Sequence, residues 1–164
     1  MKHVLITNND FDVADEYNAL CKSAPKSGAV VFFVGLVRDL YDELNEDEKI
    51  DYLELEHYPG MTENLCEDII AKANQRYPFD SVRLVHRVGR LQASDQIVMV
   101  SVASRHRENA FQAAQYIMDY LKTRATFWKK EVGQRGEHWL GLKEKDKQAA
   151  SRWNVIDDQR QGKK

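Results

Sequence analysis

The run GAVVFFVGLVRD, residues 28–39, is the feature that most constrains the fold of this chain. It is a nearly continuous series of β-branched and aromatic residues, which favour extended backbone, and it is too short to cross a membrane as a helix. Such a run predicts a strand buried in a sheet. Two similar runs, SVRLVHRVGRL (81–91) and DQIVMVSVAS (95–104), predict further strands with a turn between them, and HVLIT (3–7) predicts a short first strand.

Segments with helical periodicity alternate with these strands. FDVADEYNALCKSA (11–24) has apolar residues at helical spacing, and a second helix is expected from a cap at Thr62 to Tyr77. The longest periodic segment runs from Arg107 to about Lys130, and its predicted apolar face consists of Phe111, Ala114, Ile117, Met118, Leu121 and Ala125. Because strands and helices mix without a strict βαβ rhythm or an internal repeat, we expect an α+β fold with a mainly antiparallel sheet and one long helix.

The remaining segments complete the predicted domain. DLYDELNEDEKID (39–51) is acidic and aperiodic, which predicts a loop, whereas DYLELEHY (51–58) alternates as a half-buried strand does. HWLGLKEKDKQAASRW (138–153) predicts a strand-like piece followed by a short charged helix, and residues 154–164 predict a flexible tail. We therefore expect a single domain over residues 1–153.

The composition limits the classes of partner. With 43% hydrophobic and 30% charged residues, the chain of 164 residues has the composition of a folded globular protein. A formal net charge of −2 provides no general attraction to nucleic acid or anionic membranes, so an anion site has to be a local cluster of cations. No apolar run approaches the roughly 18 residues of a membrane helix, and the start lacks the apolar segment of a signal peptide. We expect a cytoplasmic protein.

Two lysines, Lys122 and Lys129, stand in the aromatic stretch MDYLKTRATFWKKE. On a helix, Met118 and both lysines fall within an arc of roughly 40°, at the border of the apolar face. Either the lysines lay their stems on apolar surface and keep their ammonium groups in water, or they flank a pocket. In a pocket, burial and a second cation would lower a lysine pKa, and that lysine can serve as a proton donor, a nucleophile or an anion clamp.

Further cations stand at two other places. Arg105, His106 and Arg107 open the long predicted helix, where unpaired N–H groups and the helix dipole suit a phosphate, although a basic surface turn has the same appearance. Arg38 follows the strand of residues 28–39, where it can contact a ligand or pair with a nearby carboxylate.

Other chemistries lack the residues that they need. The sequence contains no P-loop, GxGxxG or GxSxG motif, and no HxxxH or HExxH spacing, so no metal site is expected. His57 and His86 fall on strand-like segments and are interpreted as structural residues, and Cys21 and Cys66 as buried, inert thiols. The residues alone thus indicate an enzyme or binding protein with a cationic pocket for a small phosphorylated ligand.

Several strings together point to a family. ELEHYPGMTE, VHRVGRL, QYIMDYLKTRA and FWKKE occur in this order and spacing, and the chain from about Gly28 to Trp153 resembles MoaE, the large, catalytic subunit of molybdopterin synthase. The resemblance implies an α/β hammerhead-type α+β fold. It also implies sulfurtransferase activity: cyclic pyranopterin monophosphate becomes molybdopterin by gaining two dithiolene sulfurs.

The resemblance implies partners as well. The sulfur would arrive as a thiocarboxylate on the C-terminal Gly-Gly tail of a ubiquitin-like small subunit, so neither a cofactor nor a nucleophilic cysteine is expected. Two small subunits would bind a homodimer of this chain, which gives a heterotetramer.

The resemblance also implies roles for individual residues. Lys122 and Lys129 would be catalytic, and Glu131 would orient Lys129. The residues expected to bind substrate are Leu36, Val37, Arg38, His106, Arg107, Lys122, Lys129, Lys130 and Glu131. The residues expected to line the pocket are Phe33, Met118 and Lys143.

At three positions the chain departs from the family pattern. Leu36 stands where several members carry a lysine, and it offers no charge. Lys143 stands where an arginine is common, and it lacks the bidentate geometry of a guanidinium. Thr126 replaces the usual proline before the aromatic pair, which predicts that the helix continues through Lys129.

Two other functions are weighed against sulfur transfer. A non-catalytic adaptor would bind only the ubiquitin-like subunit, but it would not need both Lys122 and Lys129. A small nucleic-acid-binding protein would use the basic clusters and aromatic residues, but the net charge and the lack of a recognition motif argue against it.

Overall fold

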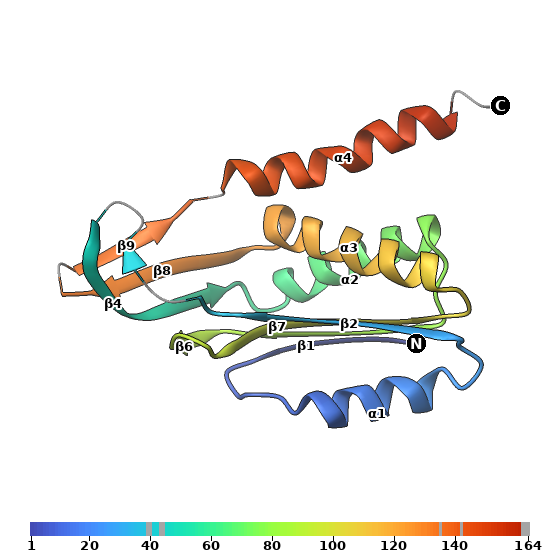
Figure 1. Cartoon of the computed structure of the whole chain (residues 1–164), viewed down its shortest axis with the longest axis horizontal. Coiled ribbons are helices and arrows are strands. Elements are labelled where there is room, and N and C mark those ends of the chain that lie inside the picture. The colour runs from blue at the N-terminus through green and yellow to red at the C-terminus, as the bar shows by residue number, and fades with distance from the viewer. Residues whose placement is uncertain (39–40, 43–44, 135, 142, 162–164) are drawn as a thin grey trace.

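The computed structural model describes the chain apart from residues 39–40, 43–44, 135, 142 and 162–164 (Figure 1). In chain order, its elements are β1 (Lys2–Thr7), α1 (Val13–Ser23), β2 (Ala29–Leu36), β3 (Tyr41–Asp42), β4 (Asn45–His57), α2 (Met61–Arg76), β5 (Ser81–Arg87), β6 (Gly89–Leu91), β7 (Gln96–Ser104), α3 (Arg107–Arg124), β8 (Phe127–Gly133), β9 (Gly136–Leu140) and α4 (Glu144–Gln161). None of the helices in this described part combines the length and the apolar character needed to cross a membrane.

The first sheet has the strand order β1-β5-β7-β2. β1 pairs with β5 in parallel, whereas β5 with β7 and β7 with β2 are antiparallel pairs. β5 and β7 occupy the centre and are almost entirely buried, which explains the apolar run of β7 and the valines and leucine of β5. β2 runs along β7 from the pair Ala29–Ser104 to the pair Leu36–Gln96, with an irregularity at Gly35.

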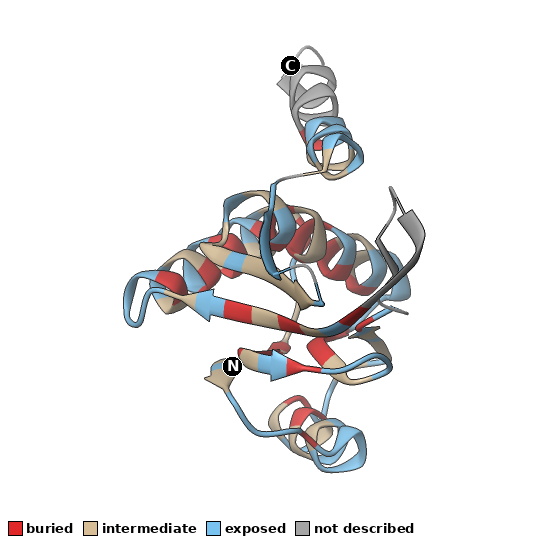
Figure 2. Cartoon of the chain, turned by 90° about the vertical axis from the view of Figure 1, so that its left-hand side faces the viewer, coloured by how far each residue is buried: buried red, intermediate tan, exposed pale blue. Residues whose placement is uncertain are grey.

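Helices cover both faces of this sheet (Figures 1 and 2). α2 and α3 pack on one face, where Ile70, Leu84 and Ile117 belong to the main core and are fully buried. α1 packs on the other face, where Leu20 and Ala103 form a smaller cluster. The buried sides of α2 and α3 face the sheet and their exposed sides face away, as amphipathic helices require.

The second sheet carries the strand that follows α3. Its order is β3-β4-β8-β9, and β6 pairs with β4 beside it. β8 runs antiparallel to β4 from Phe127 opposite His57 to Gly133 opposite Ile50. Leu53 and Leu55 of β4 are buried in the main core, as the alternation of residues 51–58 predicts.

α4 is attached to the helical layer through one aromatic residue. Trp153 is 1% exposed and makes edge contacts with Tyr77 of α2 and Tyr116 of α3. Its indole Nε1 donates to Asp119 Oδ2 at 2.9 Å, and Arg76 Nη2 donates to the Trp153 carbonyl at 2.7 Å. These contacts hold α4 alongside the end of α3, as Figure 1 shows.

The predicted α+β class with mainly antiparallel pairing is confirmed, but several boundaries are wrong. The predicted loop over residues 39–51 lies partly outside the described residues, and from Asn45 the chain is already strand β4, because cross-strand pairing with β3 and β8 overrides the weak strand preference of acidic residues. At the other end, α4 continues to Gln161, where the sequence predicts a flexible tail from residue 154.

Two predicted side-chain roles also differ. Phe111 is 61% exposed, although the periodicity of α3 places it on the apolar face; the alanines of this helix lie closest to the sheet instead. Thr62 does not cap α2, because Gly60 occupies the N-cap with φ 82° and its backbone N–H donates to Glu63 Oε2 at 2.6 Å. Thr62 is buried inside the first turn, where its hydroxyl serves a different purpose.

Candidate functional site

The two lysines lie on different elements. α3 ends at Arg124, and Ala125 is extended with φ −70° and ψ 136°, so Lys122 is in the last turn of the helix while Lys129 is in strand β8. The prediction of one helix that carries both lysines is therefore wrong. Thr126 and the aromatic residues after it favour extended backbone, and β4 offers them a complete antiparallel partner.

A pair of threonine hydroxyls fixes the turn between these elements. Thr62 Oγ1 lies 2.9 Å from Thr126 Oγ1, and the Tyr58 N–H donates to Thr62 Oγ1 at 3.1 Å. The start of α2 is thereby tied to the residue at which the chain leaves α3 for β8. This tie helps to set where Lys129 stands relative to Lys122.

Lys129 is the centre of a cluster of cations. Burial and the nearby charges of Lys122, Lys143 and Arg38 hold its pKa below the ordinary lysine value, and Asp146 partly offsets this effect. The four cations come from the end of α3, from β8, from the residue before α4 and from the second residue after β2, which are far apart in the sequence. The structure thus brings together four of the predicted site residues.

Lys122 has one carboxylate partner nearby. Its Nζ lies 3.6 Å from Oδ1 of Asp146, in the first turn of α4. The Lys122 side chain is 48% exposed, so its ammonium group remains accessible from solvent. Met118, one turn earlier on α3, is partly buried against the main core and forms part of the apolar support beneath the lysine.

Arg38 is held at its place by the residue before it. Val37 is buried; its N–H donates to the Asp95 carbonyl at 2.9 Å, and its carbonyl accepts from the Ser94 N–H at 2.7 Å. Leu36 is 54% exposed, and Phe33 is 41% exposed on the side of edge strand β2 that faces α3. The backbone at Val37 is thus fixed and delivers Arg38 to the cluster.

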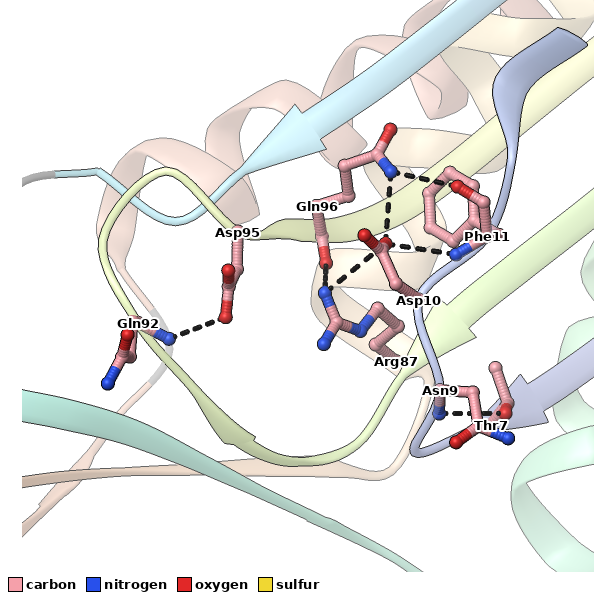
Figure 3. A network of polar contacts seen from close by, with 8 residues as sticks. All are labelled: Thr7, Asn9, Asp10, Phe11, Arg87, Gln92, Asp95 and Gln96. Carbon is pink, nitrogen blue, oxygen red and sulfur yellow. Dashed lines mark hydrogen bonds and ion pairs between the residues drawn. The ribbon is translucent and has the colours of Figure 1, made fainter.

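A polar network supports the loop that holds Val37 (Figure 3). Asp10 Oδ1 accepts from Arg87 Nη1 at 3.3 Å and from Gln96 Nε2 at 3.0 Å, and Arg87 Nη1 also donates to the Gln96 carbonyl at 3.0 Å. The Gln92 N–H donates to Asp95 Oδ2 at 2.8 Å. The end of β2 therefore rests against a loop that is fixed at both ends.

Lys130 lies on the opposite face of β8 from Lys129, because successive side chains of a strand alternate. Its Nζ is 3.1 Å from Glu137 Oε2 and 3.5 Å from Glu54 Oε2, and it stands over the ring of Trp139. Hydrogen bonding to Glu137 raises the pKa of Lys130. The structure thus does not bring Lys130 to the cation cluster, whereas Glu131 shares the face of Lys129.

His106 and Arg107 also lie away from the cluster. His106 is the N-cap of α3 and Arg107 its first residue, so α3 separates them from Lys122 by about 24 Å at 1.5 Å per residue. Both residues are exposed. Within one chain, the two predicted phosphate contacts and the lysine pair therefore cannot touch one small ligand.

The histidine and cysteine interpretations can be checked in part. His86 is 6% exposed and stacks on Phe127 at 3.8 Å between ring centroids; burial lowers its pKa to about 3, so it is neutral, and its Nδ1–H donates to the Arg87 carbonyl at 2.8 Å. Its structural role is confirmed. Cys66 is fully buried, and burial raises the pKa of its thiol to about 12, so this cysteine is inert. Cys21 is only partly buried.

Asp146 is the residue that reasoning from the sequence missed. It stands in the charged string KEKDKQ, where nothing distinguishes it from its neighbours. The packing of Trp153, seven residues later, and the ion pair of Arg152 Nε with Asp119 Oδ2 at 3.5 Å bring the first turn of α4 to the end of α3.

The fold and the site define an α+β protein with a partly buried lysine inside a cluster of cations, which is suited to an anionic ligand. The sequence model of the MoaE protein family matches residues 6–124. The chain is 48% identical over 150 residues to a protein named molybdopterin synthase catalytic subunit from Vibrio cholerae, a match that covers 92% of this chain and 97% of that protein.

Solved structures agree with the sequence comparison. A molybdopterin biosynthesis MoaE protein from Burkholderia ambifaria superimposes with a TM-score of 0.80 at 47% identity, and the match covers 94% of this chain and 99% of that one. A molybdopterin synthase from Staphylococcus aureus superimposes with a TM-score of 0.76 at 33% identity, over 86% of this chain and 98% of that one. This chain belongs to the MoaE family.

Proposed function

We propose that this chain is the catalytic subunit of a molybdopterin synthase. In this role it is a sulfurtransferase that converts cyclic pyranopterin monophosphate to molybdopterin by incorporating two dithiolene sulfurs. Family membership supports the reaction, and the names of the similar proteins are consistent with it.

The observation that carries the proposal is the environment of Lys129. Its pKa is lowered by burial and by Lys122, Lys143 and Arg38, which favours exchange of a proton nearer to neutral pH than an exposed lysine allows. The donor sulfur bonds to the pterin side chain as an oxygen leaves that side chain, and protonated Lys129 supplies the proton to the leaving oxygen. Water then cleaves the bond between the sulfur and the carbonyl carbon of the donor, so the sulfur stays on the pterin and the donor leaves as a carboxylate. Lys122, which is accessible, binds the anionic end of the sulfur donor.

The sulfur donor is a ubiquitin-like small subunit that carries a thiocarboxylate on its C-terminal Gly-Gly tail. A slim tail with an anionic end suits a site surrounded by cations. Because the donor supplies the sulfur, the reaction needs no cofactor and no cysteine of this chain, and Cys66 is buried and unreactive. We place the reaction in the cytoplasm.

A second copy of the chain supplies the phosphate contacts. His106 and Arg107 lie about 24 Å along α3 from Lys122, which is farther than a pterin monophosphate can reach. In a homodimer, the start of α3 in one copy can face the lysine pair of the other. This arrangement brings His106 and Arg107 to the site of Lys122, Lys129, Lys143 and Arg38, while Lys130 stays outside it, and it gives a heterotetramer with two small subunits.

The test is reconstitution from purified components. The protein is mixed with a thiocarboxylated small subunit and the cyclic precursor, and the dithiolene product is measured. We expect turnover that requires the thiocarboxylate and disappears when the small subunit carries an ordinary carboxylate. A protein that binds the small subunit tightly but forms no product would be an adaptor and not the enzyme.

A further inference from the structure

Asp146, in the first turn of α4, lies beside Lys122 and is largely shielded from solvent. Its Oδ1 is 3.6 Å from Lys122 Nζ, and its side chain is 20% exposed, in contrast to Glu144 in the same helical turn, which is 72% exposed. Glu144 pairs with Lys147 at 3.4 Å, within its own helix. The two acidic residues of this turn therefore face different surroundings.

The position of Asp146 is fixed from both sides. Its N–H donates to the Lys143 carbonyl at 3.0 Å, which starts the helix at that point. Seven residues later, buried Trp153 fastens α4 to α2 and α3 through Asp119 and Arg76. A helix held at this anchor presents its first turn, and thus the Asp146 carboxylate, to the last turn of α3.

The positive charges around Lys129 outnumber the negative ones. Lys122 from α3, Lys143 from the residue before α4 and Arg38, two residues after β2, all disfavour a further positive charge there, whereas Asp146 favours it. Among the described residues, neutral His86 of β5, His57 of β4 and Glu131 of β8 are further titratable groups on this side of Lys129. Leu55 and Leu140, the cross-strand partners of Lys129, carry no charge.

We propose that Asp146 is a positioning residue of the reaction, the shared counter-ion that holds the Lys122 ammonium beside Lys129 until the anionic sulfur donor arrives. This inference rests on the proposed function. Without the carboxylate, the cations at the site would repel one another, and the mobile Lys122 side chain would be free to turn away into solvent. When the thiocarboxylate enters, Lys122 exchanges one carboxylate-type partner for another, so its charge stays balanced throughout.

The competing explanation is that an acidic residue in a first turn only stabilises its helix through the helix dipole. Glu144→Gln is the matched control, because it removes the same charge from the same turn at a side chain that pairs with Lys147 of its own helix and not with Lys122. If Asp146 only stabilised its helix, Asp146→Asn and Glu144→Gln would change the melting temperature by similar amounts, and neither would change the pH dependence of the rate. A counter-ion role would move the pH profile of Asp146→Asn alone.

The experiment is the pH dependence of single-turnover sulfur transfer for the wild type, Asp146→Asn, Asp146→Glu and Glu144→Gln, with melting curves beside it. Loss of the carboxylate makes Lys129 give up its proton more readily, so we expect the alkaline limb of Asp146→Asn to move to lower pH by about half a unit or more. At pH 7 we expect its rate to fall about tenfold, because Lys122 is no longer held. Asp146→Glu should recover most of the rate, and Glu144→Gln should superimpose on the wild type.

A second readout needs neither substrate nor partner. The rate at which acetic anhydride modifies Lys129, followed by mass spectrometry across the pH range, reports the titration of its amine. We expect Asp146→Asn to shift this titration to lower pH and Glu144→Gln to leave it unchanged. If both the rate profile and the labelling of Asp146→Asn coincide with those of the wild type, the inference is overturned. A wild-type protein without turnover would refute the proposed function, whereas the labelling would still decide whether Asp146 is the counter-ion.

Discussion

Truncation of Trp153 should loosen α4 and with it the site. The side chain is 1% exposed and packs against Tyr77, Tyr116 and the guanidinium of Arg76. Replacement of a buried tryptophan by alanine typically costs about 3–5 kcal/mol. For a chain of this size, a loss of about 4 kcal/mol corresponds to a fall in Tm of about 8–16 °C.

A second substitution separates the ring from its hydrogen bond. Trp153→Phe keeps most of the aromatic packing but removes the indole N–H that donates to the Asp119 carboxylate at 2.9 Å. A hydrogen bond to a charged group contributes about 1.5–3 kcal/mol, so we expect a fall in Tm of about 3–12 °C. Trp139→Ala is the control, because Trp139 is 57% exposed on β9 and should change Tm by no more than about 2 °C.

The assay is thermal and urea unfolding followed by circular dichroism, together with single-turnover rates measured well below the lowest Tm. We expect Trp153→Ala to lose rate as well as stability, since the first turn of α4 would no longer be held against Lys122. If Trp153→Ala melts within about 2 °C of the wild type, α4 is not anchored by this residue and the reasoning fails.

Three further outcomes are expected. Lys122→Ala and Lys129→Ala should each lower the rate of product formation by about 10²–10⁴-fold without loss of folding. Lys130→Ala, on the opposite face of β8, should stay within about threefold of the wild type. An equal loss of rate in all three variants would refute the assignment of Lys122 and Lys129 as the catalytic lysines. Burial lowers the pKa of His86 to about 3, so between pH 6.5 and 3 the unfolded state binds a proton that the folded state does not. The free energy of unfolding in urea should therefore fall by about 1.4 kcal/mol per pH unit from pH 6.5 toward 3, and His86→Phe should flatten this slope. Arg107→Ala should raise KM more than it lowers kcat. Light scattering of the wild-type protein should show a dimer, and a monomer both alone and with the small subunit would contradict a site shared between two copies.

Much of the fold follows from local pattern. The period of α3 correctly places Ala114, Ile117 and Leu121 in the core, and the alternation of β4 correctly buries Leu53 and Leu55. These residues could be predicted because each segment buries one face against the same apolar core, and the spacing of its apolar side chains identifies that face.

The errors lie where distant segments meet. Sequence periodicity does not show that the helix stops before Thr126, since the reason is a hydroxyl pair with Thr62 and a partner strand that begins 81 residues earlier, at Asn45. Both lysines belong to the cation cluster, but their arrangement depends on that stop. Asp146 is a stronger case, because its position depends on the packing of α4 around Trp153.

The pairing of β2 has a consequence for synthesis of the chain on the ribosome. β2 ends at Leu36, but its partner β7 is complete only at Ser104, and β1 likewise waits for β5. At about 5–20 residues per second, the apolar run that includes β2 has no strand to pair with for about 3–14 seconds after it is made. During this interval it is an unprotected edge that can pair with another nascent chain. Yield in the cell should therefore respond to translation speed and chaperone supply more than to the stability of the finished protein.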